Sequence, residues 1–139
     1  MASTILIIDD AVNILDITKH FLVQEGYAVK TAADPKEGIR IAQEEPGINM
    51  IILDIMMPGM NGYQVFEVFK KDPRTQNIPV IMLTARAVIE NTPRPFFFGL
   101  YGVLSKPFQR WRLVQMVRDI LDLTAQGVKE GEVKEREKA

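Results

Sequence analysis

Five polar residues, whose types could together handle a charged ligand, each stand at the end of a short apolar run. Asp9 and Asp10 follow the first run, Asp54 the third, Thr84 the fourth and Lys106 the fifth. In an open parallel sheet, the residues beyond the carboxyl ends of the strands meet at one edge, and ligands bind there. Three carboxylates that converge repel one another and favour a bound cation, and oxygen donors favour Mg²⁺, with Mn²⁺ possible.

An ammonium and a hydroxyl beside such an ion suit a phosphoryl group. The metal and Lys106 would neutralise the negative charge of the group, and the hydroxyl of Thr84 would donate to one of its oxygens. The sequence therefore predicts phosphoryl chemistry with a carboxylate acceptor.

The elements that must position these residues alternate between short apolar runs and amphipathic segments. Continuous β-branched runs are typical of strands buried on both faces. Asp34 followed by Pro35 favours a helix start, with Asp as N-cap and Pro as first helical residue. The alternation predicts an α/β fold, a doubly wound five-stranded parallel sheet with helices on both faces. We expect strands at 5–8, 27–31, 50–53, 79–83 and around 103–104. Helices are expected from Val12 until Gly26, over 35–45, around 65–69 until Asp72, and around 113–121.

The composition is that of one globular domain. The chain has 139 residues, 47% of them hydrophobic and 25% charged, a net charge of −1 and no cysteine, which excludes a thiolate site and a disulfide scaffold. A balanced charge argues against direct nucleic-acid binding, and no apolar run approaches the length of a membrane helix. We expect a domain over residues 1–125, a charged tail over 126–139 that is solvated or disordered, and a cytoplasmic location.

Four short motifs contain the polar residues and occur in a fixed order. They are Ile8-Asp9-Asp10, Leu53-Asp54-Ile55-Met56-Met57-Pro58-Gly59-Met60-Asn61-Gly62, Leu83-Thr84-Ala85-Arg86 and Leu104-Ser105-Lys106-Pro107-Phe108. Each motif is weak by itself, but the four together resemble the receiver domain of response regulators in two-component signalling. The resemblance covers about residues 4–124 and implies the flavodoxin-like topology of that family.

The resemblance also implies a role for each site residue. Asp54 would be the phosphoacceptor, while Thr84 and Lys106 would contact the phosphoryl oxygens. The domain would not be an enzyme in the ordinary sense, but would assist its own phosphoryl transfer and dephosphorylation. Family members usually have a cis peptide bond at the position of Lys106-Pro107.

A metal site is implied in the same way. Asp10 and Asp54 would hold Mg²⁺ together with the backbone carbonyl of Met56, and Asp9 would act through a water molecule. No Gly-rich turn follows the first strand, so a dinucleotide or flavin site is not expected. A phosphatase that uses an aspartate nucleophile would need a second Asp where Met56 stands.

The implied function is a phosphorylation-activated signalling switch. A histidine kinase or phosphotransfer protein would donate the phosphoryl group. A downstream protein, or a second copy of the chain, would bind the face formed by helix four, strand five and helix five. The alternative is a pseudo-receiver, an interaction module that works without phosphorylation.

Two features depart from the family pattern. Val103 stands where an aromatic residue usually acts as a switch, and Tyr101, two residues earlier, is expected on the same strand face.

In the segment that would normally form helix four, Pro93 and Pro95 exclude a helix interior. We expect a mobile loop over 85–92 and a short helix from Pro93 to about Gly99 with Thr92 as N-cap. At least one of the three consecutive Phe residues at 96–98 should be exposed.

Overall fold

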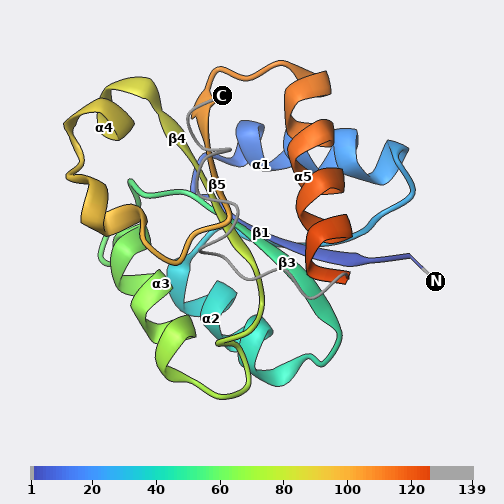
Figure 1. The fold of residues 1–139 in the computed structure, drawn as a ribbon, viewed down its shortest axis with the longest axis horizontal. Helices are drawn as coiled ribbons and strands as arrows, with labels where there is room; N and C mark the ends of the chain where they lie inside the picture. Colours follow the sequence, from blue (N-terminus) through green and yellow to red (C-terminus); the bar gives the residue numbers. More distant parts are fainter. Residues whose placement is uncertain (1, 126–139) are drawn as a thin grey trace.

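The structure, a computed structural model, describes residues 2–125 and contains one five-stranded parallel sheet (Figure 1). The strand order is β2-β1-β3-β4-β5, so the direction of winding reverses between β1 and β3, which is where a doubly wound sheet binds its ligand. The predicted fold class is confirmed. The strands are β1 (Thr4–Ile8), β2 (Ala28–Ala32), β3 (Ile48–Leu53), β4 (Val80–Ala85) and β5 (Gly102–Lys106).

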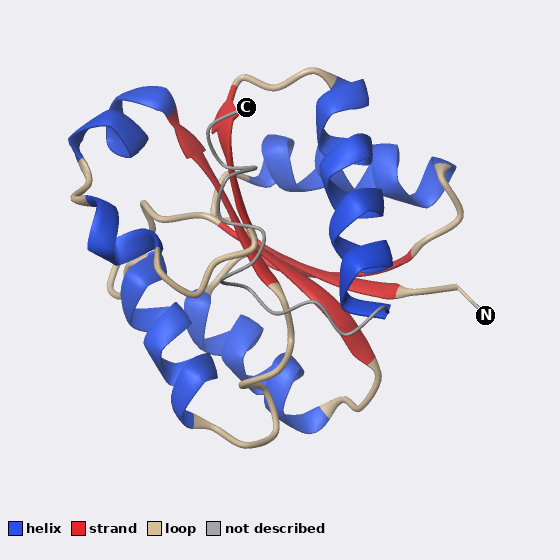
Figure 2. Cartoon of the chain, in the orientation of Figure 1, coloured by secondary structure: helices blue, strands red, loops and turns tan. Residues whose placement is uncertain are grey.

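Helices cover both faces of the sheet, with α1 and α5 on one side and α2 and α3 on the other (Figure 2). The predicted start of α2 is confirmed, because the Asp34 carboxylate accepts a hydrogen bond from the Lys36 N–H and Pro35 is the first helical residue. The helices are α1 (Val12–Gln24), α2 (Pro35–Glu44), α3 (Gly62–Lys71), α4 (Arg86–Asn91), the 3₁₀ turn η1 (Arg94–Phe97) and α5 (Arg110–Ala125).

The alternation of side chains along the strands divides the core into two layers. Ile5 and Ile7 of β1 pack under α1 and α5, whereas Leu6 and Ile8 pack under α2 and α3. All four side chains have 0% exposure, so β1 is buried on both faces and its carboxyl end is held rigidly.

The structure corrects the predicted ends of two strands. Thr84 was expected after its strand but lies within β4, and Lys106 is the last residue of β5 instead of part of the following loop. Both are held by strand pairing, since Thr84 pairs with Ser105 and Ala85 with Lys106 in the ladder between β4 and β5. The sheet itself therefore positions their side chains.

The predicted position of helix four is wrong. Residues 86–91, expected as a loop, form α4, and the proline segment forms only η1. Thr92 lies at the C-terminal end of α4, and its hydroxyl donates to the carbonyl of Val88, so Thr92 does not cap a helix start. The exclusion of Pro93 and Pro95 from a helix interior is correct, because they lack the N–H that continuation needs. Phe96 and Phe98 are exposed, as expected for part of the Phe run.

Tyr101 also differs from its predicted orientation. It precedes β5 and packs under α5, in the layer opposite to that of Val103. Its backbone N–H donates to the carbonyl of Val80, which fixes the chain where it enters the strand. Tyr101 therefore does not supply an aromatic ring on the Val103 face.

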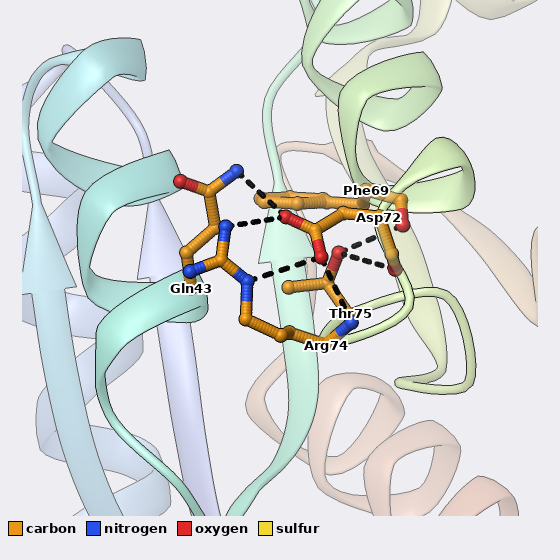
Figure 3. Close-up of polar contacts among 5 residues, drawn as sticks. All are labelled: Gln43, Phe69, Asp72, Arg74 and Thr75. Carbon is orange, nitrogen blue, oxygen red and sulfur yellow. Dashed lines mark hydrogen bonds and ion pairs between the residues drawn. The ribbon is translucent and has the colours of Figure 1, made fainter.

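The turn from α3 into β4 is fixed by a polar network, drawn in Figure 3. The Asp72 carboxylate accepts hydrogen bonds from the backbone N–H and guanidinium of Arg74 and from the amide of Gln43 on α2. The hydroxyl of Thr75, with 0% exposure, donates to the carbonyl of Phe69 at 2.7 Å. The network joins α2 and α3 ahead of β4.

Across residues 2–125, none of the helices combines the length and apolar character needed to cross a membrane. The charged tail expected at 126–139 lies outside the described residues.

Candidate functional site

Two of the predicted carboxylates are adjacent because their strands are neighbours in register. Ile8 and Leu53 are paired between β1 and β3, and the next residues are Asp9 and Asp54. The Asp54 N–H donates to the carbonyl of Ile8 at 3.0 Å, so the ladder extends to the site. Strand pairing thus places the two side chains at one edge of the sheet.

Asp10 completes an acidic cluster at this edge. Asp9, Asp10 and Asp54 each offer a carboxylate oxygen, and these oxygens all lie within 4.8 Å of one another. Asp9 is 2% exposed and Asp54 5% exposed, so water screens their repulsion poorly. A cluster of this size with only oxygen donors fits a small hard divalent cation such as Mg²⁺.

Lys106 supplies the one positive charge that the structure shows paired with these carboxylates. Its Nζ lies 2.7 Å from Asp9 Oδ2 and 3.5 Å from Asp54 Oδ2. The ammonium therefore bridges two buried carboxylates and lies closer to Asp9. The Lys106-Pro107 peptide bond is cis, as expected.

The environment of Asp54 raises the pKa of its carboxyl above the ordinary value. The largest cause is burial, which disfavours the charged form, and the second is the negative charge of Asp9. Lys106, the Thr84 hydroxyl and the backbone N–H of Met56 act in the opposite direction but do not cancel these effects. Asp54 is thus an acidic group whose charge is incompletely compensated.

Thr84 provides a buried hydroxyl at the same edge. The residue is 1% exposed, and its Oγ1 makes no well-formed hydrogen bond within residues 2–125, although the hydroxyl lies near enough to Asp54 to lower the pKa of that carboxyl. Buried hydroxyls are nearly always paired. A donor left over beside Asp54 suits an added oxygen atom, which is what a phosphoryl group on Asp54 would bring.

The loop after Asp54 is anchored at alternate residues. Ile55 and Met57 are buried, while Met56 between them is 63% exposed. The loop ends at α3, where Asn61 and Gln64 form a capping box with reciprocal hydrogen bonds. The Met56 backbone is consequently held against Asp54.

Gly62 is a site residue whose role sequence reasoning missed. A Cβ at this position would overlap the carbonyl oxygen of Asp54 and the Cα of Ile55, and the Gly62 N–H donates to the Ile55 carbonyl at 2.8 Å. Only glycine lets α3 begin this close to the acceptor loop. A glycine directly after a good N-cap such as Asn61 was the available signal.

All five predicted site side chains are therefore brought together at one edge, with the Met56 backbone beside them. Comparison with known proteins agrees with this geometry. The profile of the response regulator receiver domain matches residues 5–118. The chain belongs to the response regulator receiver domain family.

Solved structures with this fold include other receiver domains. A CheY-like response regulator receiver domain protein from Methanospirillum hungatei JF-1 shares 32% identity with a TM-score of 0.82, covering 91% of this chain and 99% of that one. The receiver domain of the Pseudomonas aeruginosa sensor histidine kinase PA1611 shares 25% identity with a TM-score of 0.78, covering 88% and 99%. The latter structure holds a magnesium ion in its active-site cleft.

Curated relatives are longer transcriptional and response regulators. RpaA of Synechocystis, a DNA-binding dual master transcriptional regulator, is 37% identical over 133 residues, covering 93% of this chain and 54% of the relative. The response regulator SaeR of Staphylococcus aureus is 34% identical over 117 residues, covering 84% and 50%. The chain spans about half the length of these relatives. Receiver domains act in phosphorylation-dependent signalling, and they bind Mg²⁺ at their acidic site.

Proposed function

We propose that this receiver domain is a switch activated by phosphorylation of Asp54. The observation that carries the proposal is the convergence of a buried, incompletely compensated carboxylate with the ammonium of Lys106 and the unpartnered hydroxyl of Thr84. Asp72, by contrast, has its carboxylate fully engaged by neighbouring donors. Asp54 is therefore the acceptor.

The transfer step uses a phosphohistidine of a histidine kinase or phosphotransfer protein. A carboxylate oxygen of Asp54 forms a bond to phosphorus while the bond between phosphorus and the imidazole nitrogen breaks. The imidazole leaves with the bonding electron pair and takes up a proton. Lys106 and Thr84 hold two of the phosphoryl oxygens, so charge that develops during transfer is neutralised by groups already in place.

The carboxylates of Asp10 and Asp54 and the backbone carbonyl of Met56 would hold Mg²⁺, with Asp9 acting through water. When bound, the ion neutralises charge on the phosphoryl group and relieves repulsion among the three carboxylates. Hydrolysis resets the switch, since attack of water on phosphorus releases phosphate and restores the Asp54 carboxylate. The domain assists both steps through the same residues.

The output face is formed by α4, β5 and α5. Trp111 on α5 is 64% exposed, and it lines a cavity of about 140 Å³ together with Tyr101 and Met116. A downstream protein, or a second copy of the chain, binds this face in the phosphorylated form. We assign residues 1–125 to the receiver unit, and the charged sequence of 126–139 lies outside it.

The test is phosphorylation of the full chain by acetyl phosphate with Mg²⁺, followed by intact-mass measurement. Wild type gains one phosphoryl group, Asp54→Asn gains none, and the matched variant Asp72→Asn gains one at the wild-type rate. Equal mass gain in Asp54→Asn would show that the acceptor is another residue. No gain in wild type would favour a module that binds its partner without phosphorylation.

A further inference from the structure

A hydrogen bond joins the first turn of α3 to the end of α4. The hydroxyl of Tyr63 donates to Thr92 Oγ1 at 2.7 Å, and the Thr92 hydroxyl donates in turn to the carbonyl of Val88 at 2.5 Å. The Thr92 hydroxyl has one hydrogen, which Val88 engages, so it must accept from Tyr63. The bond from Tyr63 joins residues 29 positions apart in the sequence, while the bond to Val88 spans only four positions.

The ring of Tyr63 also contacts the proline segment. Its centroid lies 4.9 Å from that of Phe96 on η1, a separation typical of favourable aromatic pairs. Tyr63 therefore holds both α4 and η1 against α3. It is half-buried and lies in the helix that begins beside the acceptor loop.

The space beside this contact leads back to the phosphorylation site. A groove of about 430 Å³ lies between the acceptor loop and α4, and its lining includes Ile55 and Met56 as well as Tyr63 and Thr92. Ala87, Val88 and Asn91 line the groove from the α4 side. The groove is therefore space beside α4 into which the helix could move.

The opposite end of α4 is attached directly to the site. Thr84 lies in β4, Ala85 ends that strand, and α4 begins at Arg86 with no loop between them. A displacement of Thr84 is thus passed to a helix of 6 residues, which is too short to absorb it by bending. Val88 and Ile89 pack in the same core layer as Val103, an aliphatic side chain with no ring or hydroxyl to hold the helix.

We propose that the hydrogen bond between Tyr63 and Thr92 is a latch that keeps α4 in its unphosphorylated position. This inference rests on the proposed function of Asp54. When Thr84 moves toward the phosphoryl oxygens, α4 is pulled with it, and the hydroxyls of Tyr63 and Thr92 separate. A hydrogen bond of this length does not survive a displacement of about 1 Å. The latch and the phosphorylated state therefore exclude each other.

Removing the latch should favour the active state. Tyr63→Phe keeps the ring beside Phe96 and deletes only the hydroxyl. Beryllofluoride with Mg²⁺ imitates the phosphoryl group on Asp54, and its apparent affinity depends on how readily the protein adopts the active state. We expect Tyr63→Phe to bind it roughly two- to tenfold more tightly than wild type, the range that one hydrogen bond supplies.

Thr92→Val tests the same bond from the other side. Valine keeps the branched shape and removes the acceptor, so this variant should also bind beryllofluoride more tightly. The double variant should gain no more than either single variant, because both remove one interaction. Additive gains in the double variant would overturn the latch, since the two residues would then act separately.

A matched control is Tyr27→Phe, which deletes a tyrosine hydroxyl on the opposite face of the sheet, in the layer under α1 and α5. It should bind beryllofluoride as wild type does. If wild type binds and Tyr63→Phe has unchanged or weaker affinity, the latch is refuted while the phosphorylation site stands. If wild type does not bind beryllofluoride, both the site and the latch fail.

Discussion

Asp54 and Asp72 each lie beside a basic side chain, one at the carboxyl edge of the sheet and the other in the turn that leads into β4. Arg74 donates to Asp72 from its guanidinium and its backbone, and Gln43 adds a further bond. Lys106 shares its single ammonium between Asp9 at 2.7 Å and Asp54 at 3.5 Å. Each aspartate is thus paired with a basic residue, but the Asp72 carboxylate has donors for both of its oxygens, whereas Asp54 shares its lysine with Asp9.

The difference appears in the direction of the pKa shifts. Hydrogen bonds from Arg74 lower the pKa of Asp72 below its ordinary value. Burial, followed by the charge of Asp9, raises the pKa of Asp54. The Asp72 carboxylate, with both oxygens hydrogen-bonded, stabilises a turn. The Asp54 carboxylate is buried and its charge is incompletely compensated, which is typical of a ligand-binding site.

The largest effect should come from removing Lys106. Lys106→Ala leaves Asp9 and Asp54, both nearly fully buried, without their counter-charge, and breaking such a pair costs about 3 kcal/mol. Mg²⁺ should restore part of this loss. Arg74→Ala, whose side chain is 60% exposed, should change stability far less and respond little to Mg²⁺.

Urea unfolding of both variants, with and without Mg²⁺, measures this difference. Equal losses for Lys106→Ala and Arg74→Ala would contradict the distinction between the two carboxylate environments. The beryllofluoride response of Lys106→Ala, followed by amide spectra, should also be lost.

The pH dependence of stability should have opposite signs at the two aspartates. Because the pKa of Asp54 is raised on folding, the folded state binds more protons than the unfolded state above about pH 3.9, and stability falls as pH rises through that window. Asp54→Asn should therefore be more stable than wild type near pH 7, and the advantage should vanish below about pH 4.

Asp72 should show the reverse. Its lowered pKa gives stability that is present above the unfolded value of about 3.9 and is lost as pH falls through the folded value. Asp72→Asn should be less stable than wild type near pH 7 and should approach it in acid. The measurement is the unfolding free energy of wild type, Asp54→Asn and Asp72→Asn between pH 3 and pH 8. If the two variants show the same pH dependence, the opposite signs predicted for the two aspartates are wrong.

The smallest effect should be stabilisation by Mg²⁺ alone. At free Mg²⁺ tenfold above the dissociation constant, mass action adds about 1.4 kcal/mol to the stability of wild type. Asp10→Ala should lose most of this gain, and Asp72→Asn should keep it. Thermal melts across a Mg²⁺ titration provide the measurement, and an undiminished shift in Asp10→Ala would remove Asp10 from the metal site.

The sequence by itself determined the elements whose signals are local. Apolar runs specified the five strands, Asp34-Pro35 specified the start of α2, and the polar residues at the run ends specified the site edge. These inferences succeeded because a parallel sheet brings the carboxyl ends of its strands together whatever the details of the loops. The proline rule also correctly barred a helix interior at 93–95.

Tertiary packing decided the rest. Residues 86–91 form a helix although isolated helices of this length are unstable, because Val88 and Ile89 pack against the core layer that contains Val103. Three further features depend on residues that are distant in the sequence. Lys106 lies closer to Asp9 than to Asp54, Tyr101 packs in the layer under α1 and α5, and Tyr63 contacts Thr92. Such contacts depend on the relative placement of whole elements, and no local pattern of residues carries that information.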